Sequence, residues 1–453
     1  MMDRAGDRGG SIDKGDLPTP LQDRGDQRGP WYGANEDTVP PEDRPEDGQE
    51  DRSILQDMVE DRGKDRGFDM AFDVEPGGEI DIWSSGDMGP DVEPSHWPAA
   101  IQAEITLDGE MLLPGMTPDE GPYWFVIDTG AQLTVMDADL VDGLADRVEL
   151  TFGSFSFGAM TIMGMDLSEA EAFIGWDLGG LLGFDLMRNV YAYMDYQGKR
   201  AWLFRDAQGT PWPVEVREEV GELLLETRLN TPWTTVGLGL GIEATMIPDT
   251  GSGVTILTQS VFDRIATPEM PRLEGYRWAT EYGVYDSFVT RLPIVELGGV
   301  VAEQTWAIVV PDENQLFQVL SGLLGRTIDG FLGYPIYRLF FLLVDGPGLR
   351  YELRPYRDQS HIDAGEWHRV GLDLSRRAEG DIVEMVFVGS DAEAVGIQVG
   401  DRLTAIDGSS TSGWSLDELR ISLRGEPGER RSLSLMRGEG AYEVEVLIED
   451  LLP

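Results

Sequence analysis

The sequence of 453 residues contains no cysteine, only three histidines, and only three lysines among its 35 basic residues. The absence of cysteine excludes disulfides, metal-thiolate sites and cysteine catalysis. The histidines are His96, His361 and His368, and none of them falls between residues 97 and 357, where the repeat described below lies. Their positions argue against a Ser-His-Asp hydrolase.

Long apolar stretches are also missing. No run of about 18 apolar residues suggests a membrane span, and the N-terminus lacks the basic start and apolar core of a signal peptide. The sequence as written therefore predicts a cytoplasmic protein without a membrane span. A misassigned start at "MMDRAGDRGG" would leave a periplasmic or secreted protein open.

Positive charge is scarce, because the formal net charge is -48 at pH 7 and the pI is near 4.2. Nucleic acids and anionic membranes carry the same sign of charge, so both are excluded as partners. Two explanations of the acidic, lysine-poor composition stay open. One is a saline habitat, in which salt screens the self-repulsion, and the other is an ordinary acidic protein.

A short motif, Asp-Thr-Gly, occurs twice in an apolar setting. The first copy lies in "FVIDTGAQLTVM" at residues 125–136, and the second lies in "ATMIPDTGSGVTIL" at residues 244–257. An ionised carboxylate is costly to bury unless it is paired, hydrogen-bonded or neutralised. One copy would be compatible with a plain turn. Two copies in matching settings indicate an internal repeat.

The similarity continues downstream of each copy. Residues 177–204 read "DLGGLLGFDLMRNVYAYMDYQGKRAWLF", and residues 328–354 read "IDGFLGYPIYRLFFLLVDGPGLRYELR". Each segment has a glycine, two apolar residues and a second glycine, then an apolar strand, a turn with Asp and Gly, and a final strand. The chain therefore holds two related lobes.

The repeated residues resemble the signature of the aspartic proteases, an apolar strand ending in Asp-Thr-Gly-Ser/Ala and a later apolar-apolar-Gly element. The matching residues are Asp128-Thr129-Gly130-Ala131 with Leu181-Leu182-Gly183, and Asp249-Thr250-Gly251-Ser252 with Phe331-Leu332-Gly333. The Ala-containing loop and the short lobes resemble retropepsins, whereas two lobes in one chain resemble the pepsin arrangement. The resemblance extends over residues 97–357 and implies a bilobal acid-protease β-barrel fold.

The same resemblance implies a catalytic pair, Asp128 and Asp249. Two carboxylates a few ångströms apart cannot both ionise easily, so they are expected to share one proton and to titrate as a unit. One would take a proton from a bound water, and the other would donate a proton to the scissile carbonyl. The implied activity is that of an aspartic endopeptidase acting on polypeptide substrates.

Residues around the pair are expected to support it. Thr129 and Thr250 should hydrogen-bond to the opposite loop. The glycines of the two motifs should permit the tight turns and donate N–H groups to the carboxylates. Ser252 can hydrogen-bond Asp249, which Ala131 cannot do for Asp128. The loop-support residues are therefore Thr129, Gly130, Ala131, Gly183, Thr250, Gly251, Ser252 and Gly333.

The second lobe contains an extended hairpin and a proline before its Asp-Thr-Gly motif. The segment "RWATEYGVYDSFVTRLPIVELGG" alternates and turns like an extended hairpin. Its Tyr282-Gly283 resembles the flap of pepsins, although those carry the flap in the N-terminal lobe, and an ordinary surface hairpin is the alternative. Pro248 departs from the family pattern, because proline cannot donate to a sheet ladder.

Residues 371–453 resemble a PDZ domain of the bacterial type. The run "VGDRLTAIDG" and the helix-forming "SLDELRISLRG" carry the resemblance. It implies a carboxylate-binding loop at Gly371, Leu372, Asp373 and Leu374, which would hold a C-terminal peptide added as an extra strand. Because residues two apart in a strand share a face, Leu372 and Leu374 should line the pocket for an apolar terminal side chain. Packing against the second lobe is the alternative role.

The predicted organisation is a disordered acidic tail at residues 1–95, a first lobe at 97–210, a second lobe at 211–357 and a PDZ domain at 365–453, mostly β throughout. We expect an aspartic endopeptidase that needs no cofactor or metal. It should act as a monomer, because both half-sites lie in one chain. The alternative is a peptide-binding or scaffolding protein whose lobes do not cut.

Overall fold

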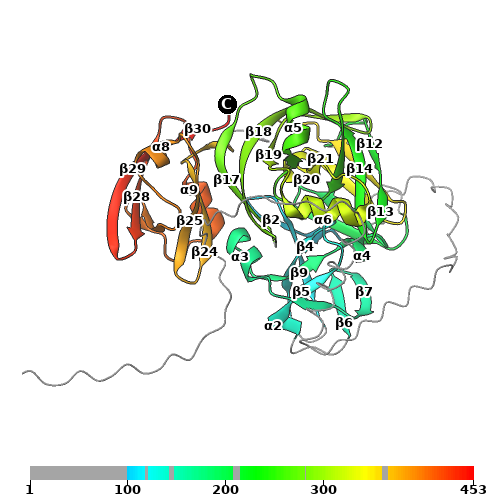
Figure 1. The fold of residues 1–453 in the computed structure, drawn as a ribbon. Coiled ribbons are helices and arrows are strands. Elements are labelled where there is room, and N and C mark those ends of the chain that lie inside the picture. The colour runs from blue at the N-terminus through cyan, green and yellow to red at the C-terminus, as the bar shows by residue number, and fades with distance from the viewer. Residues whose placement is uncertain (1–98, 118–120, 142–146, 208–214, 281, 360–365) are drawn as a thin grey trace, which may run out of the picture. The chain divides into compact units, whose positions relative to one another are not determined.

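The computed structural model of the chain describes residues 99–117, 121–141, 147–207, 215–280, 282–359 and 366–453 (Figure 1). The tail predicted at residues 1–95 lies outside this range. Strands dominate the described residues, so the mostly β class is confirmed. No helix in the described ranges is both long and apolar enough to cross a bilayer.

Strands of the first lobe form an eight-stranded sheet, in which β4 lies parallel to β9 and β5 lies antiparallel to β9. The order is β7-β6-β3-β4-β9-β5-β8, with β2 paired to β3. The bounds are β2 Glu104–Ile105, β3 Met111–Met116, β4 Tyr123–Ile127, β5 Val135–Asp137, β6 Val148–Phe152, β7 Phe155–Met160, β8 Met163–Met165 and β9 Leu178–Leu182.

The second lobe repeats this arrangement in another eight-stranded sheet, where β15 lies parallel to β20 and β16 lies antiparallel to β20. The order is β13-β14-β15-β20-β16-β19-β18-β17. The bounds are β13 Glu226–Arg228, β14 Thr231–Gly237, β15 Glu243–Pro248, β16 Ile256–Thr258, β17 Leu273–Thr280, β18 Gly283–Leu297, β19 Val300–Val310 and β20 Gly330–Leu332.

A third sheet of six strands joins the lobes, in the order β1-β11-β10-β21-β22-β12. Its centre is the antiparallel pair of β10 and β21, with Tyr193 opposite Leu343. All six residues of β21 are buried, as expected for a continuous apolar run between two covered faces. The bounds are β1 Ile101–Gln102, β10 Tyr191–Asp195, β11 Arg200–Phe204, β12 Gly221–Leu224, β21 Phe340–Asp345 and β22 Arg350–Pro355.

The two hairpins of this sheet turn in the same way. Asp195 and Asp345, both buried, each accept a hydrogen bond from the backbone N–H three residues later, at 2.9 and 2.7 Å. Arg200 and Arg350 then donate to the same carboxylates, at 2.5 and 2.7 Å. The turn residues therefore satisfy each buried carboxylate locally, and the repeat predicted from the sequence extends to side-chain contacts.

Short helices connect the strands of the lobes. Asn314 caps α6, because its side chain accepts hydrogen bonds from the N–H groups of Leu316 and Phe317. The bounds are α2 Ala138–Val141, α3 Ser168–Ile174, α4 Phe184–Met187, α5 Gln259–Ile265, α6 Gln315–Leu324 and α7 Tyr334–Tyr337.

The C-terminal unit has its own five-stranded path, β24-β25-β26-β28-β29, with β24 at one edge. Strand β25 alternates buried and half-buried residues, the pattern of a strand with one covered face. The bounds are β23 His368–Arg369, β24 Leu372–Arg377, β25 Gly380–Val386, α8 Asp391–Ala394, β26 Arg402–Ile406, β27 Ser409–Ser410, α9 Leu416–Ser422, β28 Arg430–Arg437, β29 Gly440–Leu447 and β30 Glu449–Asp450.

Aromatic residues attach the C-terminal unit to the second lobe. Trp367 and Phe387 belong to the same buried cluster as Trp306. The rings of Trp306 and Trp367 meet edge to face with centroids 5.3 Å apart. Because the cluster is continuous, the unit and the lobe share apolar core.

Replacing Trp367 by alanine tests this shared core. We expect Trp367→Ala to lower the free energy of unfolding by about 3 kcal/mol, since it removes a large side chain that is only 5% exposed. Leu224→Ala is the control, because Leu224 is 68% exposed and should change stability by less than about 0.5 kcal/mol. Urea unfolding measures both. Equal, small losses would contradict the shared core.

Candidate functional site

The two Asp-Thr-Gly loops follow equivalent strands and are held in equivalent ways. The N–H of Asp128 donates to Leu182 O at 3.0 Å, and the N–H of Asp249 donates to Leu332 O at 2.9 Å. Both bonds continue the parallel pairings of β4 with β9 and of β15 with β20. Each aspartate is therefore the first residue beyond a buried strand.

The threonines of the two loops hydrogen-bond to one another's loops. The Thr129 hydroxyl donates to Pro248 O at 2.8 Å, and the Thr250 hydroxyl donates to Ile127 O at 2.6 Å. Each hydroxyl also accepts the N–H of the other threonine, at 3.1 and 3.2 Å. Both side chains are buried. These four bonds fix the two loops against each other.

The glycines of the motifs allow the carboxyl groups to approach the opposite loop. A Cβ atom on Gly130 would lie 2.3 Å from Asp249 Cγ, and one on Gly251 would lie 2.5 Å from Asp128 Cγ. The N–H of Ala131 donates to Asp128 at 2.8 Å. The N–H of Gly251 donates to Asp249 at 2.9 Å. Any side chain at either glycine would separate the loops.

The carboxyl groups of Asp128 and Asp249 each lie against the glycine of the opposite loop and are close enough to interact electrostatically. Burial raises the pKa of Asp128 above its usual value. Burial, together with the charge of Asp128, raises the pKa of Asp249 well above its usual value. The pair can therefore hold one proton between two oxygens, and it can accept a proton from one group while donating one to another.

Two details of the second loop differ from simple expectation. Pro248 lacks an N–H, yet its carbonyl accepts the Thr129 hydroxyl, so the loop keeps the geometry of the first one. The Ser252 hydroxyl, expected on Asp249, instead donates to Val254 O at 2.7 Å. The predicted asymmetry between Ser252 and Ala131 is therefore not expressed as a contact with the carboxylate.

Gly183 and Gly333 begin the short helices α4 and α7 behind the loops. Their N–H groups donate to Thr134 Oγ1 at 3.0 Å and to Thr255 Oγ1 at 3.3 Å. A Cβ on Gly333 would lie 2.1 Å from a backbone oxygen, and one on Gly183 would lie 2.4 Å from a backbone carbon. The two positions therefore require glycine because the backbone approaches so closely.

Tyr282 and Gly283, the candidate flap, lie at the turn between β17 and β18. Gly283 has φ +138°, a conformation that favours glycine, and it pairs with Thr280. The role as a flap stays a prediction. The stem of this hairpin, residues 276–279, lines a pocket that also touches the second loop.

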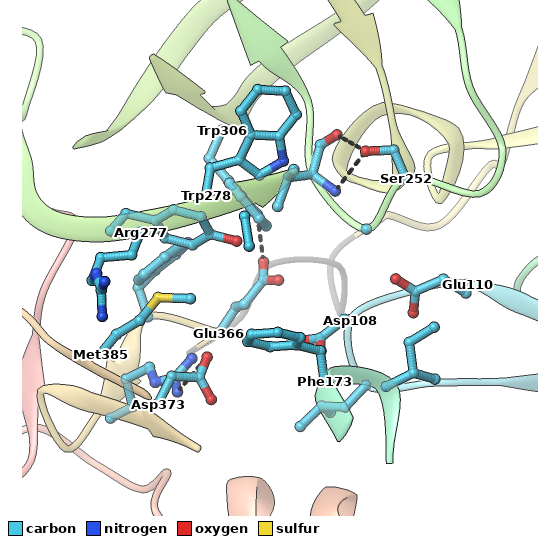
Figure 2. Close-up of a pocket in the computed structure, with 18 of the residues that line it drawn as sticks. Asp108, Glu110, Phe173, Ser252, Arg277, Trp278, Trp306, Glu366, Asp373 and Met385 are labelled. Atoms are coloured by element: carbon cyan, nitrogen blue, oxygen red, sulfur yellow. Dashed lines mark hydrogen bonds and ion pairs between the residues drawn. The ribbon is translucent and has the colours of Figure 1, made fainter. Parts of the chain in front are cut away.

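That pocket has a volume of about 310 Å³ and lies among residues 251–254, residues 276–279, Phe173 of α3 and Asp373 of the C-terminal unit (Figure 2). Its rim is mixed in charge and rich in tryptophan, including Trp278, Trp306 and Trp367. A peptide with both apolar and charged side chains fits such a lining.

Two further carboxylates, Asp108 and Glu110, reach this pocket from the turn before β3. Burial, together with the charge of Asp108, raises the pKa of Glu110 to about 7. The Thr106 hydroxyl donates to Glu110. Among the described residues, no cluster of histidine, aspartate or glutamate side chains is arranged to hold a metal ion.

The predicted carboxylate-binding loop lies at the start of β24. Leu372 and Leu374 are both buried in the core of the C-terminal unit. Gly371 O accepts hydrogen bonds from the N–H of Phe387 and the hydroxyl of Ser390, at 3.0 and 3.3 Å. These contacts fix the loop against the strand and helix behind it.

Asp373 is paired with two arginines. Arg420 Nε donates to it at 3.0 Å, and Arg369 lies at 3.3 Å. Burial alone would raise the pKa of Asp373, but the charges of Arg420 and Arg369 lower it to about 2. Sequence reasoning missed these arginines. A signal existed for Arg420, which falls on the apolar face of α9 beside Leu416 and Leu419.

The sequence pattern of the PDZ domain family matches residues 382–437. The C-terminal unit is therefore a PDZ domain, as the sequence predicted. A carboxyl-terminal-processing protease from Picosynechococcus sp. is 38% identical over 97 residues, which are 20% of this chain and 23% of that protein. A probable CtpA-like serine protease from Staphylococcus aureus is 27% identical over 88 residues, 19% of this chain and 18% of that protein.

The chain thus spans about a quarter or less of the length of these curated relatives. Among solved structures, an aspartic proteinase from Irpex lacteus is 12% identical with a TM-score of 0.38, over 58% of this chain and 98% of that one. A TM-score of 0.38 is too low to establish a shared fold. The bilobal acid-protease fold predicted from the sequence is therefore not confirmed.

The named relatives correct the predicted enzyme class. They are a C-terminal processing protease and a CtpA-like serine protease, whereas the sequence motifs predicted an aspartic endopeptidase of retropepsin-like type. That class is set aside. The prediction was wrong because it used two short motifs as evidence for a reaction, although the same loop geometry can hold paired carboxylates without defining the enzyme class.

Titration of the carboxyl pair should appear in the stability of the protein. The pKa of Asp249 is raised in the folded state. Its contribution to the free energy of unfolding is therefore fully present below the unfolded pKa, near 3.9, and is lost as the pH rises through the folded pKa. We expect Asp249→Asn to remove part of this loss. Its unfolding free energy relative to wild type should increase by about 1 kcal/mol or more between pH 4 and pH 7.

Urea unfolding at several pH values measures the difference. Asp286→Asn is the control, because Asp286 is exposed, and its difference from wild type should stay flat over this range. A flat profile for Asp249→Asn as well would show that the carboxyl at 249 has no raised pKa.

Proposed function

We propose that this protein processes polypeptides, and that its PDZ domain captures the C-terminal segment of the polypeptide. The observation that carries the proposal is the PDZ domain itself, in a chain that is 38% identical over 97 residues to a carboxyl-terminal-processing protease. The wider activity of that relative is transferred here as a proposal, because the match covers 20% of the chain.

The proposed capture uses the edge of β24. This strand ends its sheet, and within the described ranges no strand pairs with its other edge. An extended peptide can add there as a new strand, while the N–H groups of residues 371–374 meet its terminal carboxylate. Arg369 and Arg424, joined by a backbone bridge beside this loop, add positive charge that favours a carboxylate.

We further propose that residues 97–210 and 211–357 form two lobes of the acid-protease type of fold. The parallel pairings, the threonine contacts and the two Asp-Arg hairpins recur in both halves and support this. A shared fold does not carry a reaction with it. We propose that the chain acts as a monomer, since both loops lie in one chain.

The proposed centre of the lobes is the pair of Asp128 and Asp249, acting as proton donor and acceptor. The support is the position of each carboxyl group against the glycine of the opposite loop, together with the raised pKa values of both groups. Proton transfer of this kind contributes about 10²- to 10⁴-fold to a rate. The nucleophile is not assigned by this geometry, so the experiment below tests it separately.

The activity test uses a long peptide with a fluorophore at its N-terminus and a free apolar C-terminus, with products identified by mass spectrometry. We expect wild type to shorten it. Asp128→Asn and Asp249→Asn should each lower kcat by about 100-fold or more while peptide binding is retained.

A fluorophosphonate probe for nucleophilic serines is added in parallel, because the curated relatives include a serine protease. Labelling that stops cleavage supports a serine nucleophile. The absence of any cleavage by wild type contradicts the processing role. Unchanged cleavage by both Asn variants contradicts the role of the pair.

Binding at the PDZ domain makes a separate prediction. A peptide that ends in a free carboxylate should bind more tightly than the same peptide with an amidated end, by about tenfold, because amidation removes the negative charge to which the loop N–H groups donate hydrogen bonds. Fluorescence anisotropy with the full chain measures both affinities. Equal affinities would contradict capture of C-termini and leave packing as the role of the domain.

A further inference from the structure

Strand β24, which ends its sheet, is in contact with a helix of the first lobe. Helix α3 packs beside β24. Arg377, at the end of β24, forms an ion pair with Glu169 of α3 at 2.8 Å. The same guanidinium lies over the ring of Phe173, 5.5 Å from its centroid. The helix therefore presents one acidic and one aromatic side chain to the strand.

The other wall of the predicted peptide groove, α9, also contacts the first lobe. The indole N–H of Trp176 donates to Asp417 at 3.4 Å, and the N–H of Leu107 donates to the same carboxylate at 3.4 Å. A Cβ on Gly175 would lie 2.6 Å from Leu416 Cβ. Residues directly after α3 thus lie against the beginning of α9.

Arg420 of α9 contacts both β24 and the first lobe. Its Nη2 donates to Leu374 O at 2.9 Å, and its Nη1 donates to Asp108 of the first lobe at 2.5 Å. Leu372 O is occupied as well, by Arg369 Nη2 at 2.9 Å. The carbonyl groups of Leu372 and Leu374 therefore already have side-chain donors, although an added peptide strand would need main-chain groups of β24.

The PDZ domain holds the second lobe through different residues. Trp367 and Phe387 pack in the buried cluster of that lobe, and the N–H of Val388 donates to Glu274 O at 2.9 Å. Arg291 of the second lobe donates to Leu452 O at 3.0 Å. None of these contacts involves a residue of α3, so they can persist when α3 is displaced.

We infer that α3 of the first lobe covers the peptide-binding edge of the PDZ domain, and that a captured peptide must displace it. The inference rests on the proposed capture of C-termini. Figure 2 shows Phe173, Asp108 and Asp373 around the pocket where these parts meet. Displacement of α3 removes Glu169 as a partner of Arg377.

The displaced contacts define the peptide that fits. The groove offers Arg377 to an acidic group of the peptide, and its loop takes a terminal carboxylate. The preferred partner is therefore an extended peptide with an apolar C-terminal residue and an acidic residue a few positions before it. The acidic residue of the peptide replaces Glu169 as the partner of Arg377. The positive charge of this arginine is therefore balanced by a carboxylate in both states.

Binding of a peptide to the PDZ domain is expected to be coupled to the pair of Asp128 and Asp249. Asp128 belongs to the first lobe, with α3, whereas Asp249 belongs to the second lobe, to which the PDZ domain stays attached. A peptide that releases α3 removes contacts that hold the first lobe to the PDZ domain. Peptide occupancy and the setting of the carboxyl pair are thereby linked, and such a link is reciprocal.

The test changes only α3, so that the peptide groove itself keeps its residues. The double variant Glu169→Arg, Phe173→Asp should release the helix, because it reverses the ion pair and removes the aromatic contact with Arg377. Phe173 is not among the residues packed in the apolar cluster behind α3, so the lobe keeps its core.

The probe is a fluorescent peptide with a free C-terminal leucine and a glutamate four residues before it, measured by anisotropy with the full chain. If wild type spends about a tenth of its time with the edge open, the double variant should bind about tenfold more tightly. The control is Glu226→Arg. It breaks a similarly exposed ion pair with Arg326, at 3.0 Å, in the second lobe.

A reversible crosslink provides the opposite test. The chain has no cysteine, so Glu169→Cys, Arg377→Cys offers one pair of thiols at the site of the ion pair. Joining them with a bis-maleimide that contains a disulfide should abolish peptide binding. Reduction of the linker should restore it in the same sample, which rules out damage to the fold.

The outcomes separate this inference from the proposed function. Tighter binding by the α3 variant, together with loss of binding on crosslinking, supports the displaced helix. Equal binding by wild type, the α3 variant and the crosslinked protein overturns it and leaves peptide capture standing. No binding by any form, the α3 variant included, overturns both.

Discussion

The reciprocal hydrogen bonds of Thr129 and Thr250 are the contact on which the centre of this molecule depends. Each hydroxyl donates to a carbonyl of the opposite loop and accepts the N–H of its counterpart. Buried hydroxyl and backbone groups are costly unless they are bonded, so these four bonds allow two irregular loops to meet in the interior. The burial of the two carboxyl groups, and with it their raised pKa values, follows from that meeting.

Much of this centre is visible in the sequence, because it is built from local rules used twice. An apolar strand, a glycine-containing turn and a second apolar-apolar-Gly strand predicted the loops around Asp128 and Asp249, and the unit at the C-terminus carried its own recognisable pattern. The contacts of Arg420 with Asp108 and of Arg377 with Glu169 join residues more than 200 positions apart. No local periodicity reports such pairs, and the partner of Ser252 depended on a loop geometry that the motif alone did not determine.

The sequence motifs failed to predict the enzyme class for a different reason. A motif specifies which side chains can meet, whereas a reaction depends on the nucleophile, the substrate path and the exclusion of water. The carboxyl pair is compatible with proton transfer in more than one mechanism, and the named relatives are processing and serine proteases. The structure adds that the PDZ domain contacts both lobes, and that it does so through separate surfaces.

The six-stranded sheet has a consequence for how the chain folds. Its central pair joins β10 at residues 191–195 to β21 at residues 340–345, so the first lobe, once synthesised, exposes an unpaired strand edge until nearly 150 further residues have emerged. Pairings between strands so far apart in the sequence form slowly, because closing the intervening loop costs entropy before any stabilising contact forms. During that interval β10 of one chain can pair with β21 of another. Such a pairing between two chains would give a domain-swapped dimer.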